Sequence, residues 1–230
     1  MVASMNTNAS LHGLIAMGPM EQLRAGRLPE RLIRLLAGLW LYGLAIALMI
    51  EGALGASPWD VFHLGVALHA PLSLGVVMII TAVVVLLAWI PLRQMPGLGT
   101  IANTLLIGPF ADLNLAWLDS PGGLFAKIAY MLGGVLLCAF ATALYVGAQL
   151  GPGPRDGLMT GLARRTGWSI CGVRTGIELG VLIVGALLGG AVGVGTVVFA
   201  FGVGPATQFF LRYLVVPLQT PLVAASGEVR

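Results

Sequence analysis

The sequence predicts an all-α polytopic membrane protein with six transmembrane helices, arranged as a 3+3 inverted repeat with two short broken or re-entrant helices. Three observations lead to this prediction. Of the 230 residues, 58% are apolar and only 9% are charged, whereas soluble domains have about 25% charged residues. Several apolar runs approach or exceed the roughly 20 residues that cross a bilayer as a helix. The third observation is an internal duplication.

Two similar breaks interrupt long apolar runs, GASPWD at residues 55–60 and GPGPRD at residues 151–156. Their offset is 96 residues, the difference between positions 151 and 55. The same offset relates a Gly-x-Gly-Thr motif at 97–100 and a Gly-Pro pair at 108–109 to copies later in the chain. Chance would rarely supply all of these matches at one offset, so we infer a duplicated unit.

In the first half, four arginines precede a span at about 32–50. The first break then opens a segment, 57–70, that is too short to cross the bilayer. A second span at about 74–90 is closed by a proline and an arginine. A third, at about 99–117, follows a Pro-Gly turn and contains a proline.

The second half repeats this plan after a loop rich in glycine and proline. A span at about 125–148 leads to the second break, to a short segment at 154–166, and to spans at about 170–188 and 192–214. The predicted divisions are a disordered cytoplasmic tail (1–28), the first three-helix repeat (29–118), a linker (119–124), the second repeat (125–214) and a cytoplasmic tail (215–230).

The basic residues predict the orientation. Six crossings with a cytoplasmic N-terminus put eleven of the twelve Lys and Arg residues on the cytoplasmic side and leave only Lys127 outside, as the positive-inside rule requires. A seventh span would move the later arginines to the wrong side. Because each repeat has three spans, the second must be inverted relative to the first, a common architecture of secondary transporters.

The two breaks contain the main candidate residues. Ser57 can cap the helix that follows, Pro58 suits its first position, and Asp60 falls at the third, where a carboxylate can accept from free backbone amides. Asp156 has the equivalent position in the second break. Both aspartates are either structural caps or groups that line a cavity and bind a cation, a proton or a basic substrate. The predicted broken-helix hinges are Gly55, Ser57, Pro58, Gly151, Gly153 and Pro154.

Three further charged residues are candidates for the pathway. Arg155 stands where the first half has Trp59, and it is either a cytoplasmic anchor or part of an anion or lipid-headgroup site. Arg174 and Glu178 are four residues apart on one predicted helix, so they share a face and can pair. Their equivalents in the first half, Met78 and Ala82, are uncharged.

Histidine and cysteine point to no metal site. His63 and His69 are six residues apart, about 240° around a helix, so they cannot form a metal pair. His63 lies one turn after Asp60, which allows a proton-linked pair, but we expect a hydrated histidine at the membrane interface. Cys138 and Cys171 are expected to be buried free thiols, because two cysteines give no disulfide framework.

The two breaks also carry a resemblance. GASPWDV at 55–61 and GPGPRDGLM at 151–159 resemble the YczE/YitT-type bacterial integral membrane proteins over about residues 30–214. The resemblance implies a multi-span protein of the bacterial inner membrane and a role in exporting a small molecule. It carries over no established functional residues.

We therefore expect a secondary transporter or exporter of an unidentified small molecule, coupled to an ion or a proton and embedded in the lipid bilayer. The alternatives are a non-transporting partner or regulator of another enzyme, and a channel or lipid scramblase. No hydrolase, phosphate-binding or cofactor motif is visible, so we expect no enzyme activity, no cofactor and no nucleic-acid partner. Glycine-rich helices would also suit a homodimer.

Overall fold

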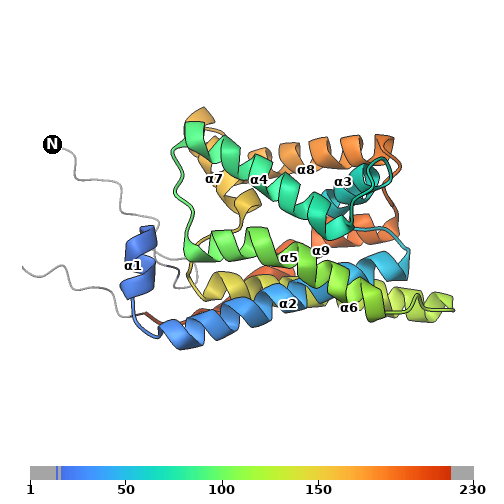
Figure 1. The fold of residues 1–230 in the computed structure, drawn as a ribbon, viewed down its shortest axis with the longest axis horizontal. Coiled ribbons are helices and arrows are strands. Elements are labelled where there is room, and N and C mark those ends of the chain that lie inside the picture. Colours follow the sequence, from blue (N-terminus) through green and yellow to red (C-terminus); the bar gives the residue numbers. More distant parts are fainter. Residues whose placement is uncertain (1–13, 15–16, 219–230) are drawn as a thin grey trace, which may run out of the picture.

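The computed structural model describes residue 14 and residues 17–218, and all regular structure within them is helical (Figure 1). The all-α prediction is therefore confirmed. The helices are α1 (Pro19–Arg24), α2 (Leu28–Gly52), α3 (Pro58–Ala67), α4 (Leu74–Leu92), α5 (Leu98–Trp117), α6 (Leu124–Gly147), α7 (Pro154–Thr166), α8 (Ile170–Leu187) and α9 (Val194–Leu214).

The six long helices run roughly along one axis, and α3 and α7 lie toward opposite ends of the bundle (Figure 1). Five of the long helices, α2, α4, α6, α8 and α9, are long and apolar enough to cross a membrane, among the residues that the structure describes. The sixth, α5, has 20 residues but is not among these five. Polar side chains such as Asn103, Asp112 and Asn114 lower its mean hydropathy.

Both breaks have the same backbone conformation. Ala53 and Gln149, which follow α2 and α6, have φ of 52° and 56°, and the glycines two residues later, Gly55 and Gly151, have φ of 112° and 117°. Glycine is the residue that adopts positive φ without strain. A Cβ on Gly55 would also lie 2.6 Å from the backbone nitrogen of Gly193, so no other residue fits there.

Each break is joined to the other half of the chain by an equivalent hydrogen bond. The Leu54 carbonyl accepts from Gly195 N at 2.7 Å, and the Leu150 carbonyl accepts from Gly99 N at 2.6 Å. Both donors and both acceptors are related by the 96-residue offset. The breaks are therefore held by the start of the last helix of the opposite half, α9 or α5.

Each short helix also packs against a long helix of the opposite half. A Cβ on Gly185 of α8 would overlap the backbone of Val61 and Phe62 in α3, and a Cβ on Gly157 of α7 would overlap the Trp89 ring in α4. Positions 61 and 157 are equivalent, as are 89 and 185. The glycine that permits the close approach thus lies on the long helix α8 in the first contact and on the short helix α7 in the second.

The two halves differ at one seam, the line along which their last two helices meet. In the first half, α4 and α5 touch backbone to backbone, because a Cβ on Gly75 or Gly108 would clash with the other residue. Asp112 accepts from Ser73 Oγ at 2.6 Å and from Gly75 N at 2.8 Å. This α4–α5 seam is closed.

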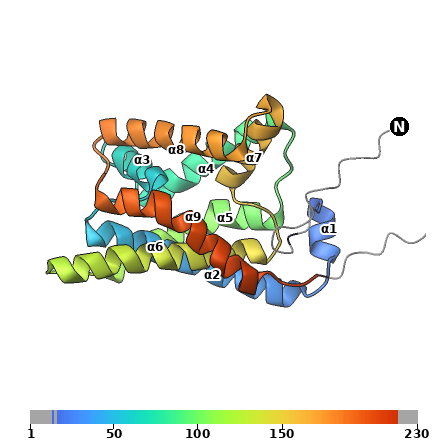
Figure 2. The ribbon, with the colours of Figure 1, turned by 180° about the vertical axis from the view of Figure 1, so that it is seen from behind.

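The equivalent α8–α9 seam is open. A Cβ on Gly204 would meet no described atom within 4 Å, and Cys171, the equivalent of Gly75, is exposed. The prediction of a buried Cys171 was therefore wrong, whereas Cys138 is buried. Figure 2 shows α8 and α9 diverging toward the end of the molecule that carries α1. A local sequence cannot reveal this difference, because Gly108 and Gly204 lie in the same Gly-Pro motif.

The seam predicts a difference in stability between two matched variants. Gly108→Ala should lower the thermal unfolding temperature of the purified protein by several degrees, because overpacking costs about 1–3 kcal/mol. Gly204→Ala, at the equivalent position, should leave it within about one degree, because the added methyl enters open space. Equal shifts for the two variants would show that the α8–α9 seam is as tightly packed as the α4–α5 seam.

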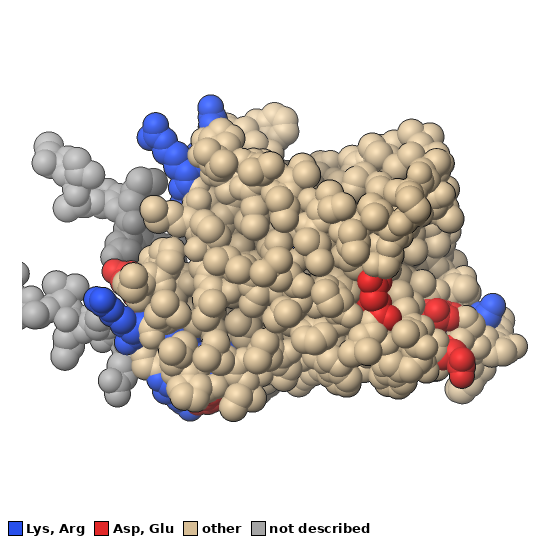
Figure 3. All heavy atoms as spheres, in the orientation of Figure 1, with Lys and Arg blue, Asp and Glu red and all other residues tan. Residues whose placement is uncertain are grey.

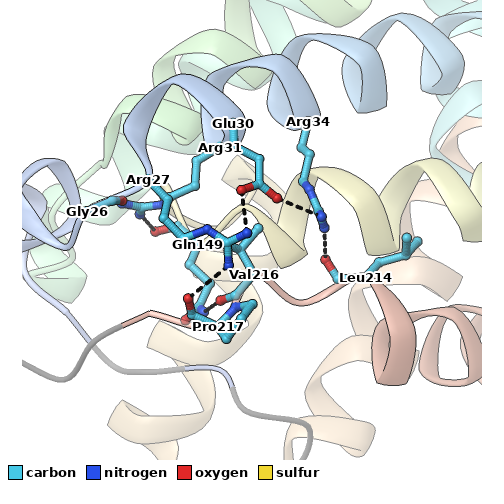
Figure 4. A network of polar contacts seen from close by, with 9 residues as sticks. All are labelled: Gly26, Arg27, Glu30, Arg31, Arg34, Gln149, Leu214, Val216 and Pro217. Carbon is cyan, nitrogen blue, oxygen red and sulfur yellow. Dashed lines mark hydrogen bonds and ion pairs between the residues drawn. The ribbon is translucent and has the colours of Figure 1, made fainter.

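Basic side chains gather at the end of the molecule where α1 and the start of α2 lie (Figure 3), and we call this end the basic end. Arg27 and Arg34 there form ion pairs with Glu30 at 2.7 and 2.8 Å. Arg31 is fully buried and donates to backbone carbonyls that include Ala148, at 2.8 Å. Figure 4 shows this network, which joins α2 to the end of α6 and to the chain after α9.

The described part of the N-terminal segment differs from the predicted tail. Residues 19–24 form α1, and the Gln22 side chain is buried. The Gln22 carbonyl accepts from Arg31 at 2.5 Å, which ties α1 to the bundle. Residue 216 of the predicted C-terminal tail is also buried, and its N–H donates to the Gly147 carbonyl at 2.9 Å. The predictions for residues 1–13, 15–16 and 219–230 lie outside the described residues.

Candidate functional site

A cavity of about 340 Å³ lies between the two breaks. Most of its lining residues occur as pairs related by the 96-residue offset, so both halves of the duplication contribute to it. A volume of this size is at the lower end of the range for small-molecule sites. The paired lining residues are Tyr42 and Cys138, Ser57 and Gly153, Pro58 and Pro154, Trp59 and Arg155, His63 and Met159, Met78 and Arg174, Ala82 and Glu178, Asn103 and Phe199, Ile107 and Val203, and Gly108 and Gly204.

The short helices α3 and α7 both begin at this cavity. Their first residues, Pro58 and Pro154, line it, while the two helices lie toward opposite ends of the bundle (Figure 1). As predicted, Ser57 caps α3, with Oγ accepting from Asp60 N at 3.2 Å, and Gly153 is the cap residue of α7. The positive ends of both helix dipoles therefore face the same space.

Asp60 lies directly behind the cavity wall. Its carboxylate is 3% exposed and accepts from Ser57 Oγ at 2.5 Å. The other carboxylate oxygen is 3.4 Å from Nδ1 of His63. Ser57 and His63 both line the cavity, so Asp60 reaches it through them. The prediction of a hydrated interfacial His63 was wrong, because the residue is 0% exposed and its ring lies near the rings of Trp59 and Phe62.

Asp156 contacts the cavity directly, in contrast to Asp60. It lines the cavity and is an exposed residue. Tyr145 Oη donates to its Oδ2 at 3.4 Å. A Cβ on Gly153 would lie 3.2 Å from this Oδ2, 3.2 Å from Tyr145 Oη and 3.3 Å from Asn103 Nδ2. The glycine cap therefore leaves room for three polar atoms to converge at the start of α7.

Arg155 lies over the face of Trp59, with the guanidinium carbon 4.7 Å from the ring centroid. This is a cation–π contact, which is worth about 0.5–2 kcal/mol depending on desolvation. Trp59 and Arg155 are equivalent positions, so the two halves of the duplication meet here. Trp59 and Arg155 occupy the same position when the two repeats are aligned, and the structure brings their side chains into contact.

Arg174 and Glu178 form the predicted i, i+4 pair, with Nε 2.9 Å from Oε1. Their side chains are 45% and 21% exposed, and both line the cavity from α8. Arg155 and Arg174 both interact electrostatically with Asp156. The cavity thus brings together Arg155, Asp156, Arg174 and Glu178, with Asp60 one residue behind its wall.

Sequence reasoning missed several residues of this cavity. Tyr42 and Tyr145 form an edge-to-face pair, with ring centroids 6.2 Å apart, on one side of it. Trp59 Nε1 and His63 Nε2 are buried, and neither has a hydrogen-bond partner among the described residues. The 96-residue offset could have drawn attention to Trp59, but aromatic residues inside apolar runs carry no other local signal. No group of three His, Cys, Asp or Glu residues in the described chain could hold a metal ion.

Comparison with known proteins agrees with the resemblance deduced from the two breaks. The family described as "Family of unknown function (DUF6198)" matches residues 29–212. An uncharacterized protein of Haemophilus influenzae is 40% identical over 180 residues, which are 78% of this chain and 83% of the relative. The uncharacterized membrane protein YczE of Bacillus subtilis is 37% identical over 177 residues, which are 76% of this chain and 82% of the relative. No solved structure matches the chain.

Proposed function

The chain belongs to the DUF6198 family, which makes it a membrane protein related to YczE, and we propose that it is a secondary transporter or exporter of a small molecule. In this proposal it spans the bacterial inner membrane with the basic end in the cytoplasm. The cavity between the two breaks is the substrate site. The observation that supports it most is that α3 and α7 begin at one cavity and lie toward opposite ends of the bundle. Secondary transporters commonly place broken helices of inverted repeats around a central site in this way.

The proposed inverted repeat is supported by the reciprocal contacts. Each break binds the last helix of the other half, and each short helix packs on a long helix of the other half. The cavity is lined from both halves by equivalent positions. Such an arrangement is expected when a pseudo-two-fold axis passes through the site and lies in the membrane plane.

The seam asymmetry supports alternating access. The closed α4–α5 seam lies toward the outer end in the proposed orientation, and the open α8–α9 seam lies toward the cytoplasm. The structure would then be the inward-open state. Exchanging the conformations of the two halves would close the α8–α9 seam, open the α4–α5 seam and expose the same cavity to the outside.

The Asp60–His63 pair is the proposed carrier of a coupled proton. His63 is fully buried, its Nδ1 faces the Asp60 carboxylate, and the residue lines the cavity. Histidine changes charge in the physiological pH range, and an intramembrane histidine beside a carboxylate is a common proton relay. Asp60 would then hold the ring in one orientation rather than contact the substrate.

The transport proposal predicts that one cavity position is reached by water from both sides of the membrane. With Cys138 and Cys171 replaced by alanine, Ala82→Cys introduces a thiol at the cavity wall on α4. A membrane-impermeant thiosulfonate should label it in intact cells and in inverted vesicles. Val84→Cys is the matched control two residues away, on the exposed apolar surface of the same helix, and should be labelled in neither.

Labelling of Ala82→Cys from one side only would contradict alternating access and favour a non-transporting membrane partner. The orientation is checked with the same reagent at two equivalent exposed positions, Leu68→Cys after α3 and Arg164→Cys in the last turn of α7. Leu68→Cys should be labelled only in intact cells and Arg164→Cys only in inverted vesicles. Labelling of both from one side would exclude an inverted repeat.

A further inference from the structure

We propose that the cavity binds a zwitterionic small molecule of the size of an amino acid, with its carboxylate on Arg155 and Trp59 and its ammonium group on Asp156. The inference rests on the proposed function, because it names the class of substrate for the same cavity. It is drawn from two opposite charges in the cavity that form no ion pair with each other, and from one buried donor without a hydrogen-bond partner among the described residues.

The first of these groups is the Arg155 guanidinium. It lies on the Trp59 ring, yet it has no hydrogen-bond acceptor and no ion pair among the described residues. A guanidinium carries five N–H donors in a planar fork that matches a carboxylate. The cation–π contact fixes its position but uses none of these donors. A charge at this depth in a membrane protein needs a partner, and a bound carboxylate would supply it.

The second group is the indole N–H of Trp59. Trp59 is 6% exposed and lines the cavity, and its Nε1 has no hydrogen-bond partner among the described residues. A buried donor without a partner costs about 1–3 kcal/mol. Because the same ring carries the guanidinium, a carboxylate bound to Arg155 lies beside this N–H. The two donors therefore define one pole of the site, and it suits an anion.

The third group is the Asp156 carboxylate, which defines the opposite pole. It is an exposed residue of the cavity wall, and the hydrogen bond that it accepts from Tyr145 Oη is long, at 3.4 Å. Arg155 is its neighbour in sequence, and Arg174 is already paired with Glu178. Neither arginine lies within 4 Å of Asp156 in the described chain. Its two oxygens keep acceptor capacity for an ammonium group.

The presence of both charges in one cavity distinguishes a zwitterion from a simple ion. A monovalent anion on Arg155 would add a negative charge beside Asp156, and a monovalent cation on Asp156 would add a positive charge beside Arg155. An uncompensated charge in a low-dielectric site is costly. A ligand with both charges compensates both residues at once. An α-amino acid carries its two charges on adjacent groups, and the cavity of about 340 Å³ suits a ligand of that size.

The test measures binding to the purified full-length protein in lipid nanodiscs. The twenty common α-amino acids are added singly at millimolar concentration, and the thermal unfolding temperature is recorded. At least one should raise this temperature in a saturable way. The corresponding N-acetyl derivative, which lacks the ammonium group, and the corresponding amide, which lacks the carboxylate, should each bind at least about tenfold more weakly.

Two variants test which residue binds each charged group of the ligand. Arg155→Gln should weaken binding of the amino acid at least about tenfold but leave binding of its amide unchanged, because the amide has no carboxylate to lose. Asp156→Asn should weaken binding of the amino acid by a similar factor and leave binding of the N-acetyl derivative unchanged. Arg164→Gln, at the exposed end of the same helix, is the control and should bind like the unmodified protein.

Three results would overturn the inference: no shift with any amino acid, equal binding of the amino acid and its singly charged derivatives, or unchanged binding in both variants. The labelling of Ala82→Cys separates this failure from failure of the proposed function. Access from both sides without zwitterion binding would leave transport standing and remove the substrate class. Zwitterion binding with access from one side would leave a binding site without transport.

Discussion

Arg31→Met is expected to lower the free energy of unfolding by about 3 kcal/mol or more, because it removes charged donors from several buried carbonyls. The Arg31 guanidinium is fully buried and donates to Ala148 O at 2.8 Å, to Gln149 O at 2.7 Å and to Gln22 O at 2.5 Å. The first two carbonyls directly follow α6, where a helix leaves its last carbonyls without intrahelical partners. Methionine fills the space of the side chain but donates nothing.

The loss of stability should extend beyond the end of α6. Residues 148 and 149 lead directly into the break at Gly151, and Gln22 belongs to α1. Removing the guanidinium should therefore release α1 and loosen the second break together. The measurement is thermal and denaturant unfolding of the purified protein, with limited proteolysis to detect release of the N-terminal segment.

The duplication supplies the control for this experiment. Lys127 is the equivalent of Arg31, and it lies beside the end of α2, where its carbonyl is near Gly52. Lys127 is a half-buried residue, and its ammonium group has no hydrogen bond or ion pair among the described residues. Lys127→Met should change stability by less than about 0.5 kcal/mol. If Arg31→Met lowered the stability equally little, water would be replacing the guanidinium as a donor. Arg31 would then not be what holds α1 and the second break to α2.

Linking α8 to α9 through a disulfide is expected to abolish access to the cavity from the basic end, which faces the cytoplasm in the proposed orientation. Cys171 and Gly204 are the equivalents of Gly75 and Gly108, which touch in the closed seam. Gly204→Cys should therefore form a disulfide with Cys171 whenever the α8–α9 seam closes, since a disulfide needs Cα atoms about 4.4–6.8 Å apart. Oxidation would trap that state.

The readout is the labelling of Ala82→Cys in a background of Cys138→Ala, measured on the peptide that contains residue 82 so that the thiols at 171 and 204 do not contribute. After oxidation, the rate from inverted vesicles should fall to the background, and the rate in intact cells should rise, because closing one side favours the state open to the other. Reduction should restore both rates. The same protein with Cys171→Ala should show neither change. A disulfide that forms without altering either rate would exclude the exchange of seam conformations, and loss of access from both sides together would favour a channel.

Much of the fold followed from local patterns in the sequence. The six long helices begin and end within about four residues of the predicted spans, because helix length in a membrane is set by the length of the apolar run. The breaks lie where glycine and proline were read as hinges, since positive φ and a missing N–H are properties of single residues. The i, i+4 pairing of Arg174 with Glu178 is equally local and was predicted correctly.

The site could be predicted only in part. Asp156, Arg155, Arg174 and Glu178 were chosen for being charges near breaks or inside an apolar run, and they all line one cavity. Their positions relative to one another could not be predicted from the sequence, because α7 and α8 meet the cavity at angles that depend on packing. The closure of one seam and the opening of its equivalent were also invisible, because Gly108 and Gly204 both lie in a Gly-Pro pair that gives no sign of the difference.

The sequence by itself determined that this protein is helical, embedded in a membrane, duplicated at an offset of 96 residues and broken twice. Only the tertiary structure decided that Arg31 is a buried cap, that His63 is enclosed, and that Arg155 lies on its own equivalent, Trp59. The physical reason is the range of the interactions. Hydropathy and backbone conformation act within a few residues, whereas these three side chains are fixed by groups from distant parts of the chain, such as the Arg31–Ala148 pair 117 residues apart.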